Sequence, residues 1–334
     1  MATFSLFSFW QGIRLATKGI CNYATNHPLV VSFEVTLSCN CNCHHCDLGG
    51  VKKDEVQLQP DEYTRLTRLL NPVVVQISGG EPLLRKDIRE IIQAIKQCGG
   101  APHLILVTNG ALLNESNYLQ LHEAGVNQFA VSLDFPDERH DEFRRHSGLF
   151  KHLEETIPQL ARFGYHDIIL NSAITRANLR DVMVLAQKAK DWNVSISYTA
   201  YTALRTQNKD YCINTGEELE LLRQTIDKLL ELKKKTNYIA NSKGVLLDTL
   251  KFFEQGYMPN CQAGKRFLVV MPDGSFVPCS MHRNKYISQK EMIEKFTCNN
   301  TCDSCYVAIR SYSEQSLLRQ LKNLPGYCKL LLAR

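Results

Sequence analysis

Short apolar, β-branched runs alternate with helical patterns of apolar residues from residue 30 to about residue 200. The runs predict strands, and the periodic stretches between them predict helices. The strands are expected at 30–36, 73–78, 103–108, 128–134, 167–174 and 195–201, and the helices near 60–70, 86–98, 114–123, 150–163 and 178–190. Asn114 and Asn178 stand where helix N-caps are expected, and Gly125 where a helix should end. Alternating strands and helices imply βαβ units and a parallel sheet, either an open doubly wound sheet or a partial barrel.

The pattern changes after residue 201. Residues 217–235 predict a long amphipathic helix, and residues 242–255 predict a second one. Apolar runs at 267–271 and 276–279 flank the segment Pro272-Asp273-Gly274-Ser275, which predicts a β-hairpin. Both chain ends carry basic residues beside aromatic residues or leucines. Such helices either lie on a membrane surface or pack on the rest of the chain, and both interpretations stay open.

Composition narrows the class of protein. The 334 residues suit one large domain or a large domain with a small one, and 44% hydrophobic residues are ordinary for a globular protein. A net charge of +5 gives little support for a nucleic-acid partner. No apolar run reaches the roughly 18–20 residues that span a bilayer. The 13 cysteines gather mostly at 39–46 and 261–305. Clustered cysteines indicate metal or Fe–S ligation in a reducing compartment, so we expect a cytoplasmic protein.

The first cysteine group directly follows the first predicted strand. Cys39, Cys43 and Cys46 have the spacing C-x3-C-x2-C. Three thiolates can hold three irons of a 4Fe–4S cluster, which leaves one iron open to a small molecule. The neighbouring His44 and His45 keep a zinc site open as an alternative. Sites in parallel α/β folds form at the carboxyl ends of the strands, which is where this loop is expected.

The cysteine spacing resembles the cluster loop of the radical S-adenosylmethionine (SAM) enzymes. The resemblance implies a partial (β/α)6 barrel, in which the open iron chelates SAM. It also implies that one electron cleaves SAM to a 5′-deoxyadenosyl radical, which takes hydrogen from a C–H bond of the substrate. In the family an aromatic residue often precedes the third cysteine, near the adenine, and His45 stands in that place.

Further segments resemble the SAM-binding motifs of that family, in the same order along the chain. They are the GGEPLL segment at 79–84, the TNG segment at 108–110, the SLD segment at 132–134 and His140-Asp141 followed by Arg144. The resemblance implies that SAM is bound by Gly79, Gly80, Glu81, Pro82, Thr108, Asn109, Ser132, Asp134, Arg144 and Asn171. Glu81 is expected to add negative charge near the SAM amino group, and Arg144 to pair with its carboxylate. Arg144 in a helix-surface ion pair and Asn171 as a buried amide are the alternatives.

The second cysteine group resembles the SPASM and twitch extensions of radical SAM enzymes. The resemblance implies a second 4Fe–4S cluster with no open iron, and too few cysteines remain for the two clusters of a full SPASM extension. We expect the ligands to be Cys261, Cys279, Cys302 and Cys305. Cys298 is a fifth candidate, and a zinc ribbon is the alternative. Cys41, inside the first group but off its spacing, is expected to be a bystander.

The expected organisation has four parts. Residues 1–27 form an N-terminal amphipathic segment, 28–235 the radical SAM barrel, 236–310 a twitch-like cluster domain and 311–334 a C-terminal amphipathic helix. The expected protein is a radical SAM oxidoreductase or maturase. Its electron donor would be a ferredoxin or flavodoxin, and its substrate a peptide, a lipid or another small molecule. Contact with a membrane surface is a further expectation. The alternative is a non-catalytic Fe–S or zinc protein.

Overall fold

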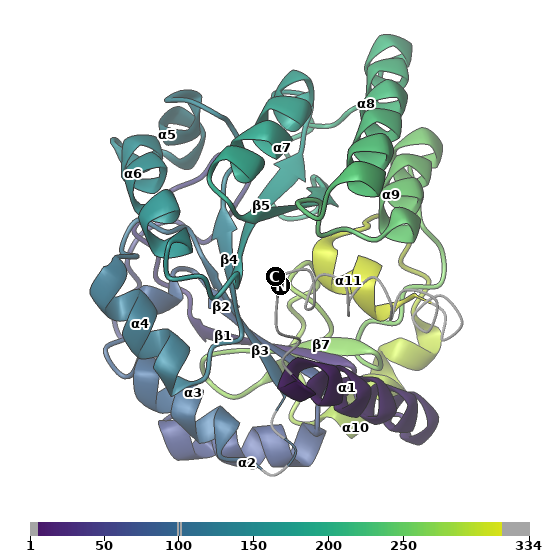
Figure 1. Cartoon of the computed structure of the whole chain (residues 1–334). Coiled ribbons are helices and arrows are strands. Elements are labelled where there is room, and N and C mark those ends of the chain that lie inside the picture. The colour runs from purple at the N-terminus through teal and green to yellow at the C-terminus, as the bar shows by residue number, and fades with distance from the viewer. Residues whose placement is uncertain (1–5, 99, 101, 316–334) are drawn as a thin grey trace.

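The centre of the molecule is a sheet of parallel strands that follow one another in chain order. The computed structural model describes residues 6–98, 100 and 102–315. Its first six strands are β1 (Val30–Thr36), β2 (Val74–Gly79), β3 (His103–Thr108), β4 (Gln128–Ser132), β5 (Ile168–Ile174) and β6 (Ser195–Ala200). Each pairs in parallel with the next. The sheet curves into an open ring, so the partial barrel is confirmed and the open doubly wound sheet is wrong (Figure 1).

Two short strands extend the sheet beyond β1. β7 (Phe267–Val270) pairs with β1 in parallel, and β8 (Phe276–Val277) returns antiparallel to β7. The predicted hairpin is therefore present. Its place in the sheet was not predicted: β7 lies beside β1 in the register Val30↔Phe267, so the order across the sheet is β6-β5-β4-β3-β2-β1-β7-β8. This pairing places the second cysteine group beside the first strand of the barrel.

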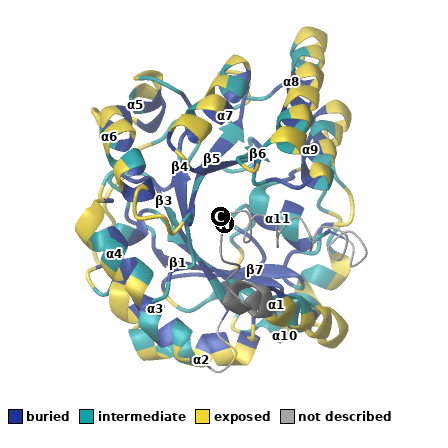
Figure 2. Cartoon of the chain, viewed as in Figure 1, coloured by how far each residue is buried: buried dark blue, intermediate teal, exposed yellow. Residues whose placement is uncertain are grey.

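Helices cover the outer face of the ring. In chain order they are α2 (Pro60–Leu70), α3 (Ile88–Lys96), α4 (Glu115–Ala124), α5 (Arg139–Arg144), α6 (Leu149–Ala161) and α7 (Val182–Asp191). In β1 the outward-facing Val31, Phe33 and Val35 are fully buried. Figure 2 shows buried strands inside a ring of helices whose outward faces are exposed. The hydrophobic core therefore lies between the sheet and the helices.

Local capping signals act as predicted at one helix and differently at another. Asn114 caps α4, where its side chain accepts the backbone N–H of Asn117 at 3.1 Å, and Gly125 ends that helix with φ 120°. Asn178 precedes a 3₁₀ turn (Leu179–Asp181) and makes no cap bond there. Its side-chain amide instead donates to the backbone oxygens of Asp134 and Ala173, at 3.0 and 2.9 Å. Asn178 thus fastens β5 to the end of β4.

The gap in the ring is closed by later helices. α8 (Gly216–Lys235) and α9 (Lys243–Gln255) pack against each other, and α9 also contacts β6. α11 (Ala308–Ser313) contacts β6, β7 and α9, and Figure 1 shows it inside the ring between β7 and α9. Helices from the part expected to form the cluster domain, residues 236–310, thus pack on the barrel, and α11 spans residue 310.

Most of the remaining described elements lie around β7 and β8. They are α1 (Leu6–Thr25), α10 (Gln289–Lys295) and the 3₁₀ turn at Thr297–Asn299. The 3₁₀ turn at Pro82–Leu84 instead follows β2 and contacts β1, β2 and β3. α1 is fastened near β7, because the guanidinium of Arg266 lies 3.4 Å from the ring centroid of Tyr23. Within the described ranges, no helix is both long and apolar enough to cross a membrane. The C-terminal helix predicted at 311–334 falls largely outside the described residues.

Candidate cofactor site

The first cysteine loop lies at the carboxyl edge of the sheet, directly after β1. The backbone N–H of Cys39 donates to Gly50 O at 3.0 Å and closes the loop on itself. The N–H groups of Asn42 and His44 donate to the backbone oxygens of Arg144 and Phe143, at 3.2 and 3.0 Å. The loop is thus held against α5, and its cysteines lie at the edge where parallel α/β folds place their sites.

A cavity of about 150 Å³ opens beside this loop. Its lining includes Cys39, Cys43, Cys46, Gly79, Gly80, Thr108, Asn109, Ser132 and Arg144. These nine predicted site residues come from the loop after β1 and from the ends of β2, β3 and β4, with Arg144 from α5. Four other predicted residues, Glu81, Pro82, Asp134 and Asn171, are not part of the lining.

Gly79 and Gly80 allow the turn after β2 to pack directly on the cysteine loop. Gly79 has φ 130°, and a Cβ there would lie 2.1 Å from the backbone oxygen of Thr36. A Cβ on Gly80 would lie 2.0 Å from the backbone oxygen of Ser38. The N–H of Gly80 donates to that Thr36 oxygen at 2.7 Å. Any larger residue would therefore push the cysteine loop away from the turn.

Glu81 lies behind the cavity lining and is held by three hydrogen-bond donors. Its carboxylate is fully buried and accepts the Thr108 hydroxyl at 2.8 Å, the Asn109 N–H at 2.8 Å and the Leu83 N–H at 3.1 Å. Burial raises the pKa of Glu81 to about 7, although these three donors favour the ionised form. Glu81 thus joins the turn after β2 to the TNG segment, and it does not line the cavity. Pro82 is also buried and begins the 3₁₀ turn.

The TNG segment reaches the cysteine loop through Asn109. The side-chain amide of Asn109 donates to Asn40 Oδ1 at 2.7 Å and lies 3.8 Å from the Cys39 sulfur. Its own carbonyl oxygen accepts the N–H of Ala111 at 2.9 Å, which fixes the side-chain orientation. Three neighbouring strand ends are therefore connected through hydrogen bonds at this edge.

Arg144 and Asp134 form a buried ion pair beside Cys43. Arg144 Nε donates to Asp134 Oδ2 at 2.9 Å, and Arg144 Nη1 lies 3.8 Å from the Cys43 sulfur. Burial opposes ionisation of Asp134, but the Arg144 charge holds the pKa of that carboxyl below its ordinary value. The ion pair given as the alternative for Arg144 is therefore present, in the interior and not on a helix surface. Arg144 also lines the cavity.

Hydrogen bonds from Cys41 change the acidity of two of the three predicted ligands. The Cys41 thiol lies between Cys39 and Cys43, and its hydrogen bonds lower the pKa of both. The pKa of Cys43 falls to about 6, with a further contribution from Arg144. Burial raises the pKa of Cys46. Cys41, expected to be a bystander, lines the cavity too. In the part of the chain that the structure describes, no three His, Cys, Asp or Glu side chains converge on a single-ion site.

His45 lies at the same cavity as a neutral aromatic side chain. Its ring stacks on Phe143, with the centroids 4.7 Å apart and the planes 7° from parallel. Burial lowers the pKa of His45 to about 3, so the ring is uncharged at neutral pH. An uncharged, stacked imidazole can present a flat face to an aromatic ligand.

Asn171 lies one strand away from the cavity lining. It is paired in register with Ser132 on β4 and with Ser197 on β6. Neighbours in register on a parallel sheet point to the same side. Ser132 lines the cavity, so Asn171 and Ser197 belong to the same inner face of the ring.

The second cysteine group gathers beside β7. Cys261, Cys279 and Cys305 are buried. Cys302 packs against the group of buried hydrophobic side chains that contains Cys261 and Cys279. A hydrogen bond from Cys261 lowers the pKa of Cys302 to about 5. Cys298 lies in the 3₁₀ turn at Thr297–Asn299 and is exposed. Burial raises the pKa of Cys305, with a contribution from the neighbouring Cys302. The four predicted ligands are therefore close together, and the fifth candidate is exposed at the surface.

His282 is a polar neighbour of this group that the sequence reasoning missed. Its backbone N–H donates to the Cys279 sulfur at 3.4 Å, and its ring Nε2 lies 3.4 Å from the Cys302 sulfur. Cys279 and His282 form a C-x2-H pair, a spacing typical of metal ligands. That spacing was the available signal.

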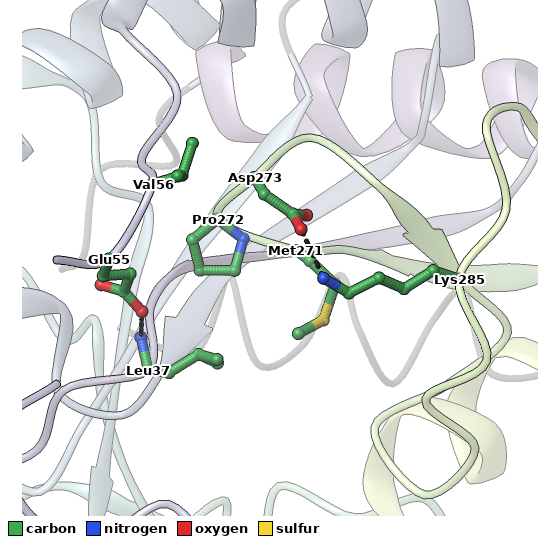
Figure 3. Close-up of a pocket in the computed structure, with 7 residues that line it drawn as sticks. All are labelled: Leu37, Glu55, Val56, Met271, Pro272, Asp273 and Lys285. Carbon is green, nitrogen blue, oxygen red and sulfur yellow. Dashed lines mark hydrogen bonds and ion pairs between the residues drawn. The ribbon is translucent and has the colours of Figure 1, made fainter.

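A second cavity, of about 180 Å³, lies at the outer edge of the sheet near the turn between β7 and β8. Figure 3 shows that its polar groups are already paired: Lys285 contacts Asp273, and Glu55 accepts the backbone N–H of Leu37. None of the predicted site residues lines it. The chemistry is therefore expected at the cysteine-lined cavity.

Comparisons with known proteins agree with this arrangement. Residues 33–189 match the Radical SAM superfamily. The AdoMet-dependent heme synthase of Methanosarcina barkeri is 30% identical over 195 residues, covering 56% of this chain and 54% of that protein. The GTP 3′,8-cyclase of Aquifex aeolicus is 29% identical over 212 residues, covering 60% of this chain and 66% of that protein. The matched part is thus about half to two thirds of each relative.

A solved structure shows the same fold over most of the chain. Streptococcus suis SuiB bound to S-adenosylmethionine superposes with a TM-score of 0.61 at 16% identity, covering 92% of this chain and 71% of SuiB. The matched sequence region contains the first cysteine loop and the turns that line its cavity. Residues 33–189 of the chain therefore form a domain that matches the radical SAM superfamily, whose enzymes bind SAM and a 4Fe–4S cluster.

Proposed function

We propose that this protein is a radical SAM enzyme that works at the cysteine-lined cavity. Cys39, Cys43 and Cys46 would hold the 4Fe–4S cluster. The observation that carries the proposal is that these three thiols share one cavity with the Gly79-Gly80 turn and Arg144. Thiolates are the usual ligands of Fe–S clusters, and three of them leave one iron for SAM. When bound, the cluster and SAM supply a 5′-deoxyadenosyl radical that removes hydrogen from an unactivated C–H bond.

The chain's own residues would bind and orient SAM. Arg144 is fixed by Asp134 through Nε, and its Nη1 is beside Cys43, so that nitrogen can donate to the SAM carboxylate. Gly79 and Gly80 bring backbone groups to the cavity wall. Glu81 would act indirectly, because its hydrogen bonds hold Thr108 and Asn109 in place. Ser132 is a further hydrogen-bonding side chain of the lining.

The second cysteine group would hold an auxiliary 4Fe–4S cluster. Cys261, Cys279, Cys302 and Cys305 are its proposed ligands. The support is that all four gather beside β7 whereas Cys298 is exposed. A cluster with four protein ligands has no open iron, so it would accept an electron from the substrate or relay one. This favours a net oxidation or a bond-forming reaction, with a ferredoxin or flavodoxin as the external electron donor.

The names of the relatives support radical chemistry, but they do not agree on a single substrate. A heme synthase and a GTP cyclase are both similar to this chain at 29–30% identity. SuiB has also been solved with its precursor peptide SuiA, but at 16% identity its likeness concerns the fold alone. We therefore propose an oxidised, cross-linked or otherwise modified product and leave its identity to experiment.

The test is SAM cleavage by the reconstituted protein. After anaerobic iron and sulfide loading, dithionite and SAM should yield 5′-deoxyadenosine. The variants C39A, C43A and C46A should each lose this product, because each removes a cluster ligand. C21A is the matched control, since Cys21 is exposed on α1. An iron-loaded wild-type protein that forms no 5′-deoxyadenosine would favour the alternative, a non-catalytic Fe–S protein.

A further inference from the structure

A polar cluster crosses the inner face of the ring between the two cysteine groups. Glu34, on β1, lies 3.3 Å from Arg283, which follows β8. Arg205, in the segment after β6, is paired with Asp47, which directly follows Cys46. The side chains of Glu34, Arg205 and Arg283 are only 4%, 16% and 26% exposed. Burial raises the pKa of Glu34, and the charges of Arg283 and Arg205 oppose this rise, so the three residues lie near one another in a largely buried place.

This cluster adjoins the cysteine-lined cavity on one side. Glu34 is paired in register with Ser78, and Ser78 lines that cavity. Burial alone would lower the pKa of Arg205, but the neighbouring Cys46 and Asp47 raise this pKa above its ordinary value. Arg205 therefore lies beside Cys46, the third cysteine of the first group. On the other side, Arg283 directly follows His282, whose ring is in contact with Cys302. A molecule bound at this cluster would lie between both cysteine groups.

Arg205 and Arg283 each have an N–H group that makes no hydrogen bond. A guanidinium carries five N–H groups. Arg283 directs its two terminal nitrogens at Glu34, and Arg205 directs one at Asp47. The Nε atoms of both arginines are buried and have no hydrogen-bond partner. Buried donors without a partner are rare in folded proteins, so they indicate that an acceptor is bound here in the working state.

A row of further polar residues lies on the same inner face. Ser132, Asn171 and Ser197 form a row across three strands, and Ser197 is 3.2 Å from the Tyr312 hydroxyl of α11. Apolar ligands are usually bound by apolar walls with few polar groups. An inner face of hydroxyls, an amide and paired charges suits a polar ligand, and it does not suit a lipid chain.

We propose that Arg205, Arg283 and Glu34 form the substrate subsite, and that it binds an oxyanion, either a carboxylate or a phosphate, carried by a polar substrate. That a reaction takes place beside this subsite rests on the proposed function. That the subsite binds an oxyanion rests on the geometry alone. The planar fork of an arginine matches both oxyanions, so two arginines can hold one such group from two sides. Asp47 is 39% exposed and can turn to solvent when the oxyanion takes its place at Arg205. The arrangement orients the substrate between the SAM cavity and the second cysteine group.

The test measures oxyanion binding to the reconstituted full chain at low ionic strength. Inorganic phosphate would be followed by ³¹P line broadening, and acetate by saturation-transfer NMR. We expect R205Q and R283Q to weaken binding of the preferred oxyanion about 10-fold or more, since each removes charge-assisted hydrogen bonds. R223Q is the matched control, because Arg223 lies in an ion-paired, exposed position on α8. Comparison of phosphate with acetate shows which oxyanion the subsite prefers.

Equal affinity in the wild type, R205Q and R283Q would overturn the subsite, as would no binding of either anion to the wild type. R205K and R283K keep the charge and lose the fork, so weaker binding by folded lysine variants supports the proposal even where a glutamine variant does not fold. Arginine-dependent binding in a protein that forms no 5′-deoxyadenosine would refute the proposed function and leave the subsite standing.

Discussion

Asp134 illustrates how single residues hold the cofactor site together. Its carboxylate accepts Arg144 Nε at 2.9 Å and the N–H of Ala173 at 3.1 Å. Its own N–H donates to His140 Nδ1 at 3.2 Å, and its backbone oxygen accepts the Asn178 amide. The SLD segment was predicted to contact SAM, but its aspartate lies behind the cavity wall. We infer that Asp134 orients Arg144, which does line the cavity.

The buried His140 predicts how stability changes with pH. Burial, together with the Arg144 charge, lowers the pKa of His140 to about 3. The unfolded chain has a histidine pKa near 6.5, so between about pH 6.5 and 3 only the unfolded chain takes up this proton. The contribution of neutral His140 to the free energy of unfolding is therefore present in full above pH 6.5 and is lost as the pH falls. At pH 5 the loss is at most about 2 kcal/mol.

The check is urea unfolding of cluster-free protein at pH 8 and pH 5, for the wild type and H140N. Asparagine Oδ1 can accept the Asp134 N–H in place of Nδ1, and it does not titrate. The wild type should lose up to about 2 kcal/mol more than H140N between the two pH values. Equal losses in both proteins would mean that His140 is not held neutral in the folded state.

At the scale of elements, α11 closes the ring through one arginine. Arg310 is fully buried and donates to the backbone oxygens of Cys305, Met258 and Pro259, at 2.6, 2.7 and 2.9 Å. Its Nε pairs with Glu314 at 2.8 Å. Arg310 thus satisfies three carbonyl groups around the second cysteine group and fastens α11 beside β7.

We expect R310M to destabilise the protein by roughly 3–5 kcal/mol, because it leaves Glu314 and three carbonyl oxygens without their donor. It should also reduce iron bound by the second cysteine group, since Cys305 loses its backbone anchor. Urea unfolding and iron content measure the two effects. The control R223M changes an exposed arginine and should leave both unchanged. An R310M protein with wild-type stability would show that this network is not what holds α11.

Most of the fold and much of the candidate site could be predicted from local patterns in the sequence. The six barrel strands and the cysteine loop depend on periodicity and spacing within short segments. Pairings between distant segments have no such signal. β7 joins β1 although Val31 and its partner Leu268 are 237 residues apart in the sequence, and this pairing was not predicted. Glu34 and Arg283, 249 residues apart, were missed for the same reason. The hydrogen bonds of Glu81 to the TNG segment were not predicted, because a motif fixes position along the chain and not side-chain direction.

For the whole molecule, two cysteine groups predict two clusters. Reconstituted wild type should bind about eight irons per chain, and a C302A/C305A variant about four. C298A should keep about eight, because Cys298 is exposed. Iron and sulfide analysis, with Mössbauer spectra to confirm the cluster type, would measure this. About four irons in the wild type would refute the auxiliary cluster.

The central claim is that Cys39, Cys43 and Cys46 leave one iron open for SAM. The most direct measurement is the electron paramagnetic resonance spectrum of the dithionite-reduced protein before and after SAM is added. Binding of SAM to an open iron changes the ligands of that cluster alone. The account predicts that one of two reduced-cluster signals shifts and that C43A lacks the shifting signal. A fully reduced, iron-loaded protein whose spectrum is the same with and without SAM would contradict it.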